Sequence, residues 1–347
     1  MKRGVLLMAV AGLLLAGCKS DKIVINVYNW GEYISDGTDG TLNVNKKFTE
    51  ETGIKVNYTT FASNEEMYAK IKSNAADYDV IIPSDYMIGR MIEEGMLEKL
   101  NFENIPNASK IDPRFTKREF DPTGEYSVPY TWGTVGIIYN TKKVNEPVDS
   151  WNILWDKKYA DNILMFNNSR DAFAIACKKL GYSLNTTKKE ELLAAAEELK
   201  AQKEVIQAYV MDEIFDKMQN GEAALAPYYA GDAITMIDGN PDLAFSVPKE
   251  GSNVFIDAMC IPKGAKNKEA AEKYIDFLCR TDIAKANIEF LGYSTPQTEV
   301  LEQLDEEVRN NPIIYPPQEV LDRCETMLSL PREAAQEMEN LWIRVKL

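Results

Sequence analysis

The sequence predicts an α/β protein of two lobes, each a mixed, mostly parallel sheet flanked by helices. Short apolar strands alternate with helix-length amphipathic stretches through both halves of the 347 residues, and this order typically builds parallel sheets. Two extended segments without helical periodicity, 126–139 and 254–262, interrupt the alternation. Because a chain of this length exceeds the usual size of a single core, we expect these segments to cross between the lobes as a hinge.

The first half of the chain predicts the order strand, helix, strand, helix, strand. The spacing of apolar residues places strands at 23–28, 55–61 and 79–82, and helices at 41–52 and 63–72. Ser63 precedes Glu66 by three residues, which is the capping-box signature of a helix start. This βαβαβ order predicts parallel strand neighbours.

The second half repeats the alternation without repeating the sequence. We expect strands at 163–166, 223–229 and 243–247, and helices at 170–180 and 188–203. We therefore expect an N-terminal lobe of residues 18–132 and 258–300 and a C-terminal lobe of 133–257 and 301–347. Ligands of open α/β sheets bind at the carboxyl ends of strands, so a site is expected where strand ends face the cleft between the lobes.

The N-terminus has the features of a bacterial lipoprotein signal. Lys2 and Arg3 precede the apolar run 5–15, which ends in Leu15-Ala16-Gly17-Cys18. The run is too short to span a bilayer, and small residues before a cysteine match a lipobox. We expect removal of residues 1–17 and acylation of Cys18 with chains such as palmitate. The membrane contact would then be the lipid anchor alone, with the protein facing the periplasm or the cell exterior.

The charge balance and the residue types exclude several functions. The chain has 39 Lys+Arg against 54 Asp+Glu, a net charge of −15, which falls by two more when Lys2 and Arg3 leave with the signal. This acidity opposes nucleic-acid binding and would concentrate a cationic solute. The sequence contains no histidine, which excludes His-based catalysis and His-ligated metals.

The remaining cysteines offer no metal-binding spacing. Cys177, Cys260, Cys279 and Cys324 lie far apart and mostly beside apolar residues, so buried free thiols are the favoured interpretation. A Cys260–Cys279 or Cys177–Cys324 disulfide stays open as an alternative, because the expected compartment is oxidising.

Several predicted strand ends combine aromatic rings with acids or hydroxyls. Carboxylates bind ammonium groups, while ring faces pack on methylenes and attract positive charge, so this composition suits an organic cation with an apolar body. The groups are Trp30-Gly31-Glu32-Tyr33, Ser84-Asp85-Tyr86, Tyr228-Tyr229 with Asp232, and Phe255 with Asp257, joined by Asp171 and Tyr293.

Each candidate has a structural alternative. Trp30 and Tyr33 flank a glycine turn, where cleft lining is favoured over a core position. Asp257 interrupts an apolar run, so it is either ion-paired or ligand-binding. Asp171 starts a helix and could serve only the helix dipole. Strand alternation leads us to expect that only one of Tyr228 and Tyr229 reaches a ligand.

An ordered series of sequence blocks resembles the spermidine/putrescine-binding proteins of bacterial polyamine ABC importers. No single block is decisive, but their order covers nearly the whole mature length. The blocks are Tyr28-Asn29-Trp30-Gly31-Glu32-Tyr33, Thr52-Gly53-Ile54-Lys55-Val56, Ser63-Asn64-Glu65-Glu66-Met67-Tyr68-Ala69-Lys70, Tyr78-Asp79 through Pro83-Ser84, Val128-Pro129-Tyr130-Thr131-Trp132-Gly133, Lys179-Leu180-Gly181-Tyr182, Val247-Pro248-Lys249-Glu250-Gly251, Ala265-Lys266-Asn267-Lys268-Glu269 and Gly292-Tyr293-Ser294-Thr295-Pro296.

The resemblance implies a two-lobed periplasmic-binding-protein fold of type II that closes on a small polyamine. It also implies a monomer that delivers the ligand to the membrane subunits of an ABC permease. The pocket positions it implies are Trp30, Glu32, Tyr33, Ser84, Tyr86, Asn168, Asp171, Tyr229, Phe255, Asp257 and Tyr293.

The chain departs from the spermidine-type pattern at several of these positions. Asn168 stands in place of an aspartate, Tyr229 and Phe255 in place of tryptophans, and Gly31, Met211 and Met327 in place of polar residues. Because the pocket would lose an acid and hydrogen-bonding groups, we expect putrescine to bind at least as tightly as spermidine.

Two other functions are weighed against polyamine binding. A ferric-ion-binding protein of the same fold would use Tyr228 and Tyr229 as phenolate ligands, but the set of metal ligands is incomplete. An enzyme is disfavoured because the sequence has no GxSxG motif, no Walker lysine loop and no dinucleotide fingerprint. We expect no catalytic residue, no metal and no cofactor.

Overall fold

The computed structural model describes residues 23–74 and 76–347. The predicted signal segment 1–17 and the predicted lipidation site Cys18 lie outside these residues. None of the helices that the structure describes is long and apolar enough to cross a membrane.

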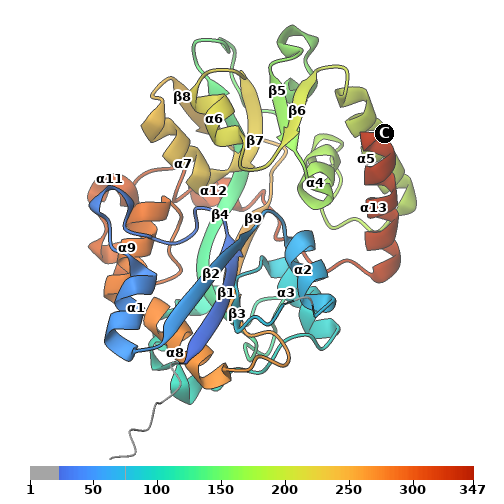
Figure 1. Ribbon diagram of the computed structural model, residues 1–347. Coiled ribbons are helices and arrows are strands. Elements are labelled where there is room, and N and C mark those ends of the chain that lie inside the picture. Colours follow the sequence, from blue (N-terminus) through green and yellow to red (C-terminus); the bar gives the residue numbers. More distant parts are fainter. Residues whose placement is uncertain (1–22, 75) are drawn as a thin grey trace, which may run out of the picture.

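The described strands form a nine-stranded sheet that runs through the whole molecule (Figure 1). Eight strands follow one path, and the ninth, β8 (Leu243–Ser246), pairs with β4 beside that path. The path has the order β2 (Lys55–Phe61), β1 (Val24–Trp30), β3 (Val80–Ile81), β9 (Val254–Cys260), β4 (Ser127–Asn140), β7 (Leu225–Tyr229), β5 (Ile163–Phe166) and β6 (Ile206–Val210).

Helices flank both ends of this sheet (Figure 1). Around the β1–β3 end lie α1 (Val44–Thr52), α2 (Asn64–Lys72), α3 (Asp85–Glu93), α8 (Lys268–Leu278) and α9 (Thr281–Leu291). Around the β5–β8 end lie α4 (Ser169–Lys179), α5 (Lys189–Gln202), α6 (Ile214–Gln219), α7 (Ala230–Gly239) and the C-terminal α13 (Arg332–Lys346). The short helices α10 (Thr298–Gln303), α11 (Glu306–Arg309) and α12 (Gln318–Leu321) precede α13.

The two predicted crossing segments are the strands β4 and β9, which lie side by side and join the two ends of the molecule (Figure 1). β4 pairs antiparallel with β9 through Ser127–Thr134, and from Val135 onward it pairs antiparallel with β7 and β8. The partner of β4 therefore changes at Val135, two residues beyond the lobe border that the sequence predicts. The lobe borders themselves stay a prediction.

Each end of the sheet combines parallel and antiparallel pairing. β1 pairs parallel with β2 and β3, and β5 pairs parallel with β6 and β7, as the βαβ order predicts. Antiparallel pairing enters with the crossing strands β4 and β9. The mixed α/β class predicted from the sequence is confirmed.

Local sequence rules account for several element boundaries. β2 and β5 have the bounds that their apolar runs predict, whereas β3 keeps only two of four expected residues. The Ser63 hydroxyl accepts a hydrogen bond from the Glu66 backbone N–H at 3.2 Å and caps α2. The strand β6 and the helices α3 and α7 were not predicted from the sequence. Residues just after β6 and in the first turns of α3 and α7 belong to the candidate site.

The four described cysteines are free thiols. Cys177, Cys260 and Cys279 are buried and Cys324 is half-buried. Burial raises the pKa of the Cys177 thiol to about 12. The favoured interpretation of buried free thiols is confirmed for Cys177, Cys260 and Cys279, and neither disulfide alternative is formed.

Candidate functional site

A pocket of about 630 Å³, open solvent included, lies where strands from both ends of the sheet terminate. Trp30 ends β1, Ser84 follows β3, and Tyr229 ends β7. The lining consists of Trp30, Gly31, Tyr33, Ala62, Asn64, Ser84, Asp85, Tyr86, Asp171, Met211, Asp212, Tyr228, Tyr229, Asp232, Asn253, Phe255, Asp257, Tyr293 and Met327.

Most of the residues predicted from the sequence meet in this pocket. Trp30, Tyr33, Ser84, Tyr86, Asp171, Tyr229, Phe255, Asp257 and Tyr293 all line it. Tyr228 lines it together with Tyr229, and the expectation that only one of the two tyrosines reaches a ligand stays a prediction. Whether each residue contacts a ligand stays a prediction.

Two predicted residues do not line the pocket. Glu32 is exposed, adopts a left-handed backbone conformation with φ of 50°, and is not among the residues that line the pocket. Asn168 caps α4: its Oδ1 accepts from the Asp171 N–H at 2.8 Å, and its Nδ2 donates to Asp171 Oδ2 at 2.9 Å. Asn168 therefore positions Asp171 from behind the pocket wall.

The pocket also contains residues that the sequence argument did not single out. Asn64 Nδ2 donates to the Ser84 hydroxyl and to the Tyr86 hydroxyl, both at 3.1 Å, and so organises that wall. Asp212 follows the missed strand β6, and the strand-end rule would have found it had that strand been predicted. Ala62 and Asn253 complete this group.

Three helices begin at the pocket with an aspartate in their first turn. These residues are Asp85 of α3, Asp171 of α4 and Asp232 of α7. The positive end of a helix dipole stabilises an anion at this position. The Asp85 carboxylate is already occupied, because it accepts hydrogen bonds from the backbone N–H groups of Tyr86 at 2.7 Å and Ile256 at 3.1 Å. Asp171 and Asp232 are the first-turn acids left to face a ligand.

Asp257 lies in the middle of β9 with 4% of its surface exposed. Its Oδ2 accepts a hydrogen bond from the Tyr33 hydroxyl at 2.6 Å, whereas its buried Oδ1 has no hydrogen-bond partner. Burial raises the pKa of Asp257 to about 6, although the Ser84 and Tyr33 hydroxyls lower it. A buried carboxylate oxygen without a donor is costly, so a cationic group in the pocket would relieve this cost.

Asp171 is the second buried carboxylate of the pocket. Its Oδ2 accepts a hydrogen bond from the Tyr229 hydroxyl at 2.7 Å in addition to the one from Asn168. Burial raises its pKa, and the two hydrogen bonds act in the opposite direction. The sequence left open whether Asp171 serves only the helix dipole. In the structure, Asp171 also lines the pocket.

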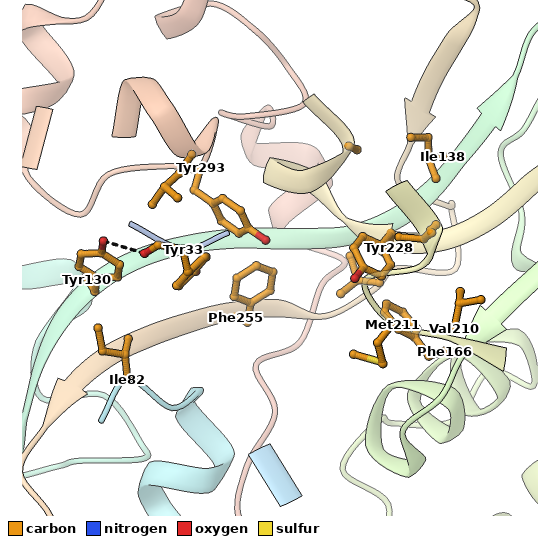
Figure 2. Packing of buried hydrophobic residues seen from close by; sticks show 14 of the residues in the cluster. Tyr33, Ile82, Tyr130, Ile138, Phe166, Val210, Met211, Tyr228, Phe255 and Tyr293 are labelled. Carbon is orange, nitrogen blue, oxygen red and sulfur yellow. Dashed lines mark hydrogen bonds between the residues drawn. The ribbon is translucent and has the colours of Figure 1, made fainter. Parts of the chain in front are cut away.

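Aromatic rings form a row through the site, and Figure 2 shows three of its members, Tyr33, Tyr293 and Phe255. Ring centroids are 5.0 Å apart for Tyr33–Tyr293, 6.2 Å for Tyr293–Phe255 and 5.5 Å for Phe255–Tyr229. A Cβ atom on Gly231 would lie 2.0 Å from the Tyr293 ring, so any larger residue at position 231 would clash with this ring. The row gives the pocket an apolar wall that can pack against methylene groups.

Trp30 also lines the pocket and packs against Phe61, with the two ring centroids 4.6 Å apart. It is half-buried, and its indole N–H is buried without a hydrogen-bond partner. Carboxylates set among ring faces are suited to bind an organic cation.

The pKa values of Tyr228 and Tyr229 argue against the alternative of a ferric-ion-binding protein. Burial raises the pKa of both phenols well above their ordinary value, and Asp171 raises that of Tyr229 further. Phenolate ligands are therefore disfavoured. Within residues 23–74 and 76–347 there is no group of three or more acidic or cysteine side chains that could hold a metal ion.

Comparisons with known proteins agree with this geometry. Residues 43–316 match the family described as bacterial extracellular solute-binding protein. A spermidine/putrescine-binding periplasmic protein of Salmonella typhimurium is 37% identical over 324 residues, which span 92% of this chain and 91% of that protein.

Two solved structures share the fold. A protein of Listeria monocytogenes, described as a spermidine/putrescine ABC transporter, is 38% identical with a TM-score of 0.89, and the match covers 93% of this chain and 99% of that one. The TpPotD lipoprotein of Treponema pallidum is 28% identical with a TM-score of 0.81 and the same coverage. The predicted periplasmic-binding-protein fold is confirmed, and the chain belongs to the family of bacterial extracellular solute-binding proteins.

Proposed function

We propose that this protein captures a polyamine in the pocket and delivers it to the membrane subunits of an ABC permease. The observation that carries the proposal is a buried carboxylate with an unpartnered oxygen in a pocket lined by a row of aromatic rings. Asp257 Oδ1 lacks a donor, and the rings of Phe255 and Tyr229, with centroids 5.5 Å apart, line the same pocket. The relatives from Salmonella and Listeria, described as handling spermidine and putrescine, support the same ligand class.

The proposal includes the lobe motion. The N-terminal lobe would comprise residues 18–132 and 258–300 and the C-terminal lobe residues 133–257 and 301–347, with β4 and β9 as the hinge. Support comes from the change of partner along β4 at Val135. Both lobes contribute acids and rings to the pocket, so closure would surround the ligand with both sets.

The protein is further proposed to be a monomeric lipoprotein held at the membrane by Cys18. The lipobox supports this anchor, as does the description of the Treponema relative as a lipoprotein. A binding role accounts for the carboxylates without any catalytic step.

Calorimetric titration of the protein without its lipid anchor tests the ligand class. Putrescine and spermidine are expected to bind with one-to-one stoichiometry, and neutral amino acids are expected to give no binding heat. Addition of ferric ions should leave the protein colourless. An absence of polyamine binding, or a visible iron charge-transfer band, would contradict the proposal.

A further inference from the structure

Asn253 is a pocket-lining amide that was not predicted from the sequence. It directly precedes β9 and lines the pocket together with Phe255 and Asp257 of that strand. Side chains two residues apart in a strand point to the same face, and the intervening Val254 and Ile256 pack into a different apolar cluster from that of Phe255. An amide, a ring and a carboxylate therefore follow one another along the pocket face of β9.

The backbone around Asn253 is held from both sides. Its carbonyl oxygen accepts a hydrogen bond from the Val135 N–H of β4 at 3.0 Å. On the other side Asn253 pairs with Glu325, and the Val254 N–H donates to the Glu325 carbonyl oxygen at 3.0 Å. The Glu325 carboxylate forms a 2.8 Å ion pair with Lys178 of α4. The amide is thus fixed in place before a ligand binds, which reduces the entropy cost of binding.

The side-chain oxygen of Asn253 is buried without a donor. The residue has 6% of its surface exposed, and within residues 23–74 and 76–347 no hydrogen-bond partner reaches its Oδ1. A buried amide oxygen without a donor costs free energy, and an asparagine with a purely structural role ordinarily bonds to nearby backbone. Since Asn253 lines the pocket, an N–H group of a ligand can supply the donor that its surroundings lack.

Met327 lines the same pocket and lies two residues after Glu325, the pairing partner of Asn253. It is buried, and its thioether has no N–H or O–H to donate, so it cannot satisfy the Asn253 oxygen. The sequence predicts that the pocket has lost a polar group at position 327. Asn253 places a hydrogen-bonding group on the segment that pairs beside it.

We propose that Asn253 is a further ligand-binding residue of the pocket, whose Oδ1 accepts a hydrogen bond from an N–H group of the bound polyamine. This inference rests on the proposed function. An amide oxygen is uncharged, so it accepts from an ammonium, a guanidinium or a neutral N–H group alike. The pocket face of β9 would then offer one charged contact, at Asp257, and one uncharged contact, at Asn253.

Titration calorimetry of Asn253→Leu with putrescine and with spermidine tests this role. Leucine is close to asparagine in shape but has no acceptor, so we expect the affinity for each polyamine that the wild type binds to fall by roughly tenfold. Because Oδ1 has no partner in the described protein, the ligand-free variant should be at least as stable as the wild type in urea unfolding. Unchanged affinity would overturn the proposal.

Asn287→Leu is the matched control. Asn287 is buried outside the pocket, and its Oδ1 accepts a hydrogen bond from the Ser35 backbone N–H at 3.0 Å. The same substitution should therefore lower the free energy of unfolding and leave the affinity of the folded protein unchanged. An affinity loss equal to that of Asn253→Leu would show that the effect is not specific to the pocket and would contradict the proposal.

A second variant, Asn253→Asp, keeps the shape and an acceptor oxygen. At alkaline pH, where the new carboxylate is ionised, we expect polyamine affinity to be retained or raised, because the same N–H group can still donate. A loss as large as that of Asn253→Leu would overturn the acceptor role of Oδ1. If the wild type binds neither polyamine, the proposed function itself fails, whereas wild-type binding that Asn253→Leu leaves unchanged removes only Asn253 from the site.

Discussion

The Tyr33 hydroxyl donates a 2.6 Å hydrogen bond to Asp257 Oδ2, joining the turn after β1 to the middle of β9 across 224 positions of the chain. Tyr33 also contacts the Thr131 hydroxyl on β4. The Tyr33 side chain therefore connects the turn after β1 to both crossing strands, β4 and β9. This arrangement leaves the second oxygen of Asp257 free for a ligand.

Asp257→Asn is expected to weaken polyamine binding by roughly 2–5 kcal/mol, because a desolvated ammonium group loses its charged partner. Titration calorimetry measures the change. Since burial disfavours the charged carboxylate, the ligand-free variant should remain as stable as the wild type in urea unfolding. Unchanged affinity in a folded variant would remove Asp257 from the site.

Trp30→Ala is expected to reduce the binding free energy by roughly 0.5–2 kcal/mol through the lost cation–π contact. Trp155→Ala is the matched control, because Trp155 is half-buried away from the pocket and donates its N–H to the Glu198 carbonyl oxygen at 2.8 Å. The control should lower stability and leave affinity unchanged. Full binding by Trp30→Ala would assign Trp30 to packing against Phe61.

Polyamine affinity is expected to fall as the pH drops through about 7 and then about 6, the pKa values of Asp232 and Asp257. The ligand amines stay charged in this range while the carboxylates become protonated. Titrations at several pH values, at constant ionic strength, measure the effect. A constant affinity across this range would contradict a role for both acids.

The same two acids predict the opposite trend for the ligand-free protein. Their pKa values in the folded state lie above the ordinary value of 3.8, so their contribution to stability is greatest below that value and is lost as the pH rises through about 6 and 7. The rise in melting temperature on adding spermidine should therefore be larger at alkaline than at acidic pH. A larger rise at acidic pH would refute the assignment.

Arg170→Gln is expected to lower the free energy of unfolding by on the order of 3 kcal/mol. The buried guanidinium donates to the carbonyl oxygens of Leu184 at 3.0 Å and Leu328 at 2.9 Å, and both would lose a charged donor. Arg114→Gln is the control, since the Arg114 side chain is 78% exposed and bonds to nearby Asp112. If Arg170→Gln and Arg114→Gln lose the same free energy of unfolding in urea, the hydrogen bonds of the buried Arg170 do not contribute to stability.

Cys18→Ser is expected to abolish incorporation of labelled palmitate and to release the protein from the membrane fraction. Cys324→Ser is the control, because Cys324 is a half-buried free thiol elsewhere in the chain. It should retain both the label and the membrane location. A wild-type protein without label would contradict the lipobox interpretation.

The sequence by itself determined the alternation of strands and helices, the two crossing segments and the strand ends that carry rings and acids. These features depend on local spacing, so they can be read from a short window of residues. The ends of β1, β3 and β7 accordingly placed Trp30, Ser84 and Tyr229 in one pocket.

Only the tertiary structure decided which side chains of those strand ends face the pocket. Glu32 is exposed and has a left-handed backbone, and Asp212 lines the pocket beside Gly31, which follows β1 and leaves room for its carboxylate. Contacts of this kind join residues far apart in the chain and depend on shape complementarity at the scale of one carbon atom. Local spacing carries no such information, and for this reason Asp171 and Asp257 were predictable as pocket residues while the absence of Glu32 from the pocket wall and the presence of Asp212 in it were not.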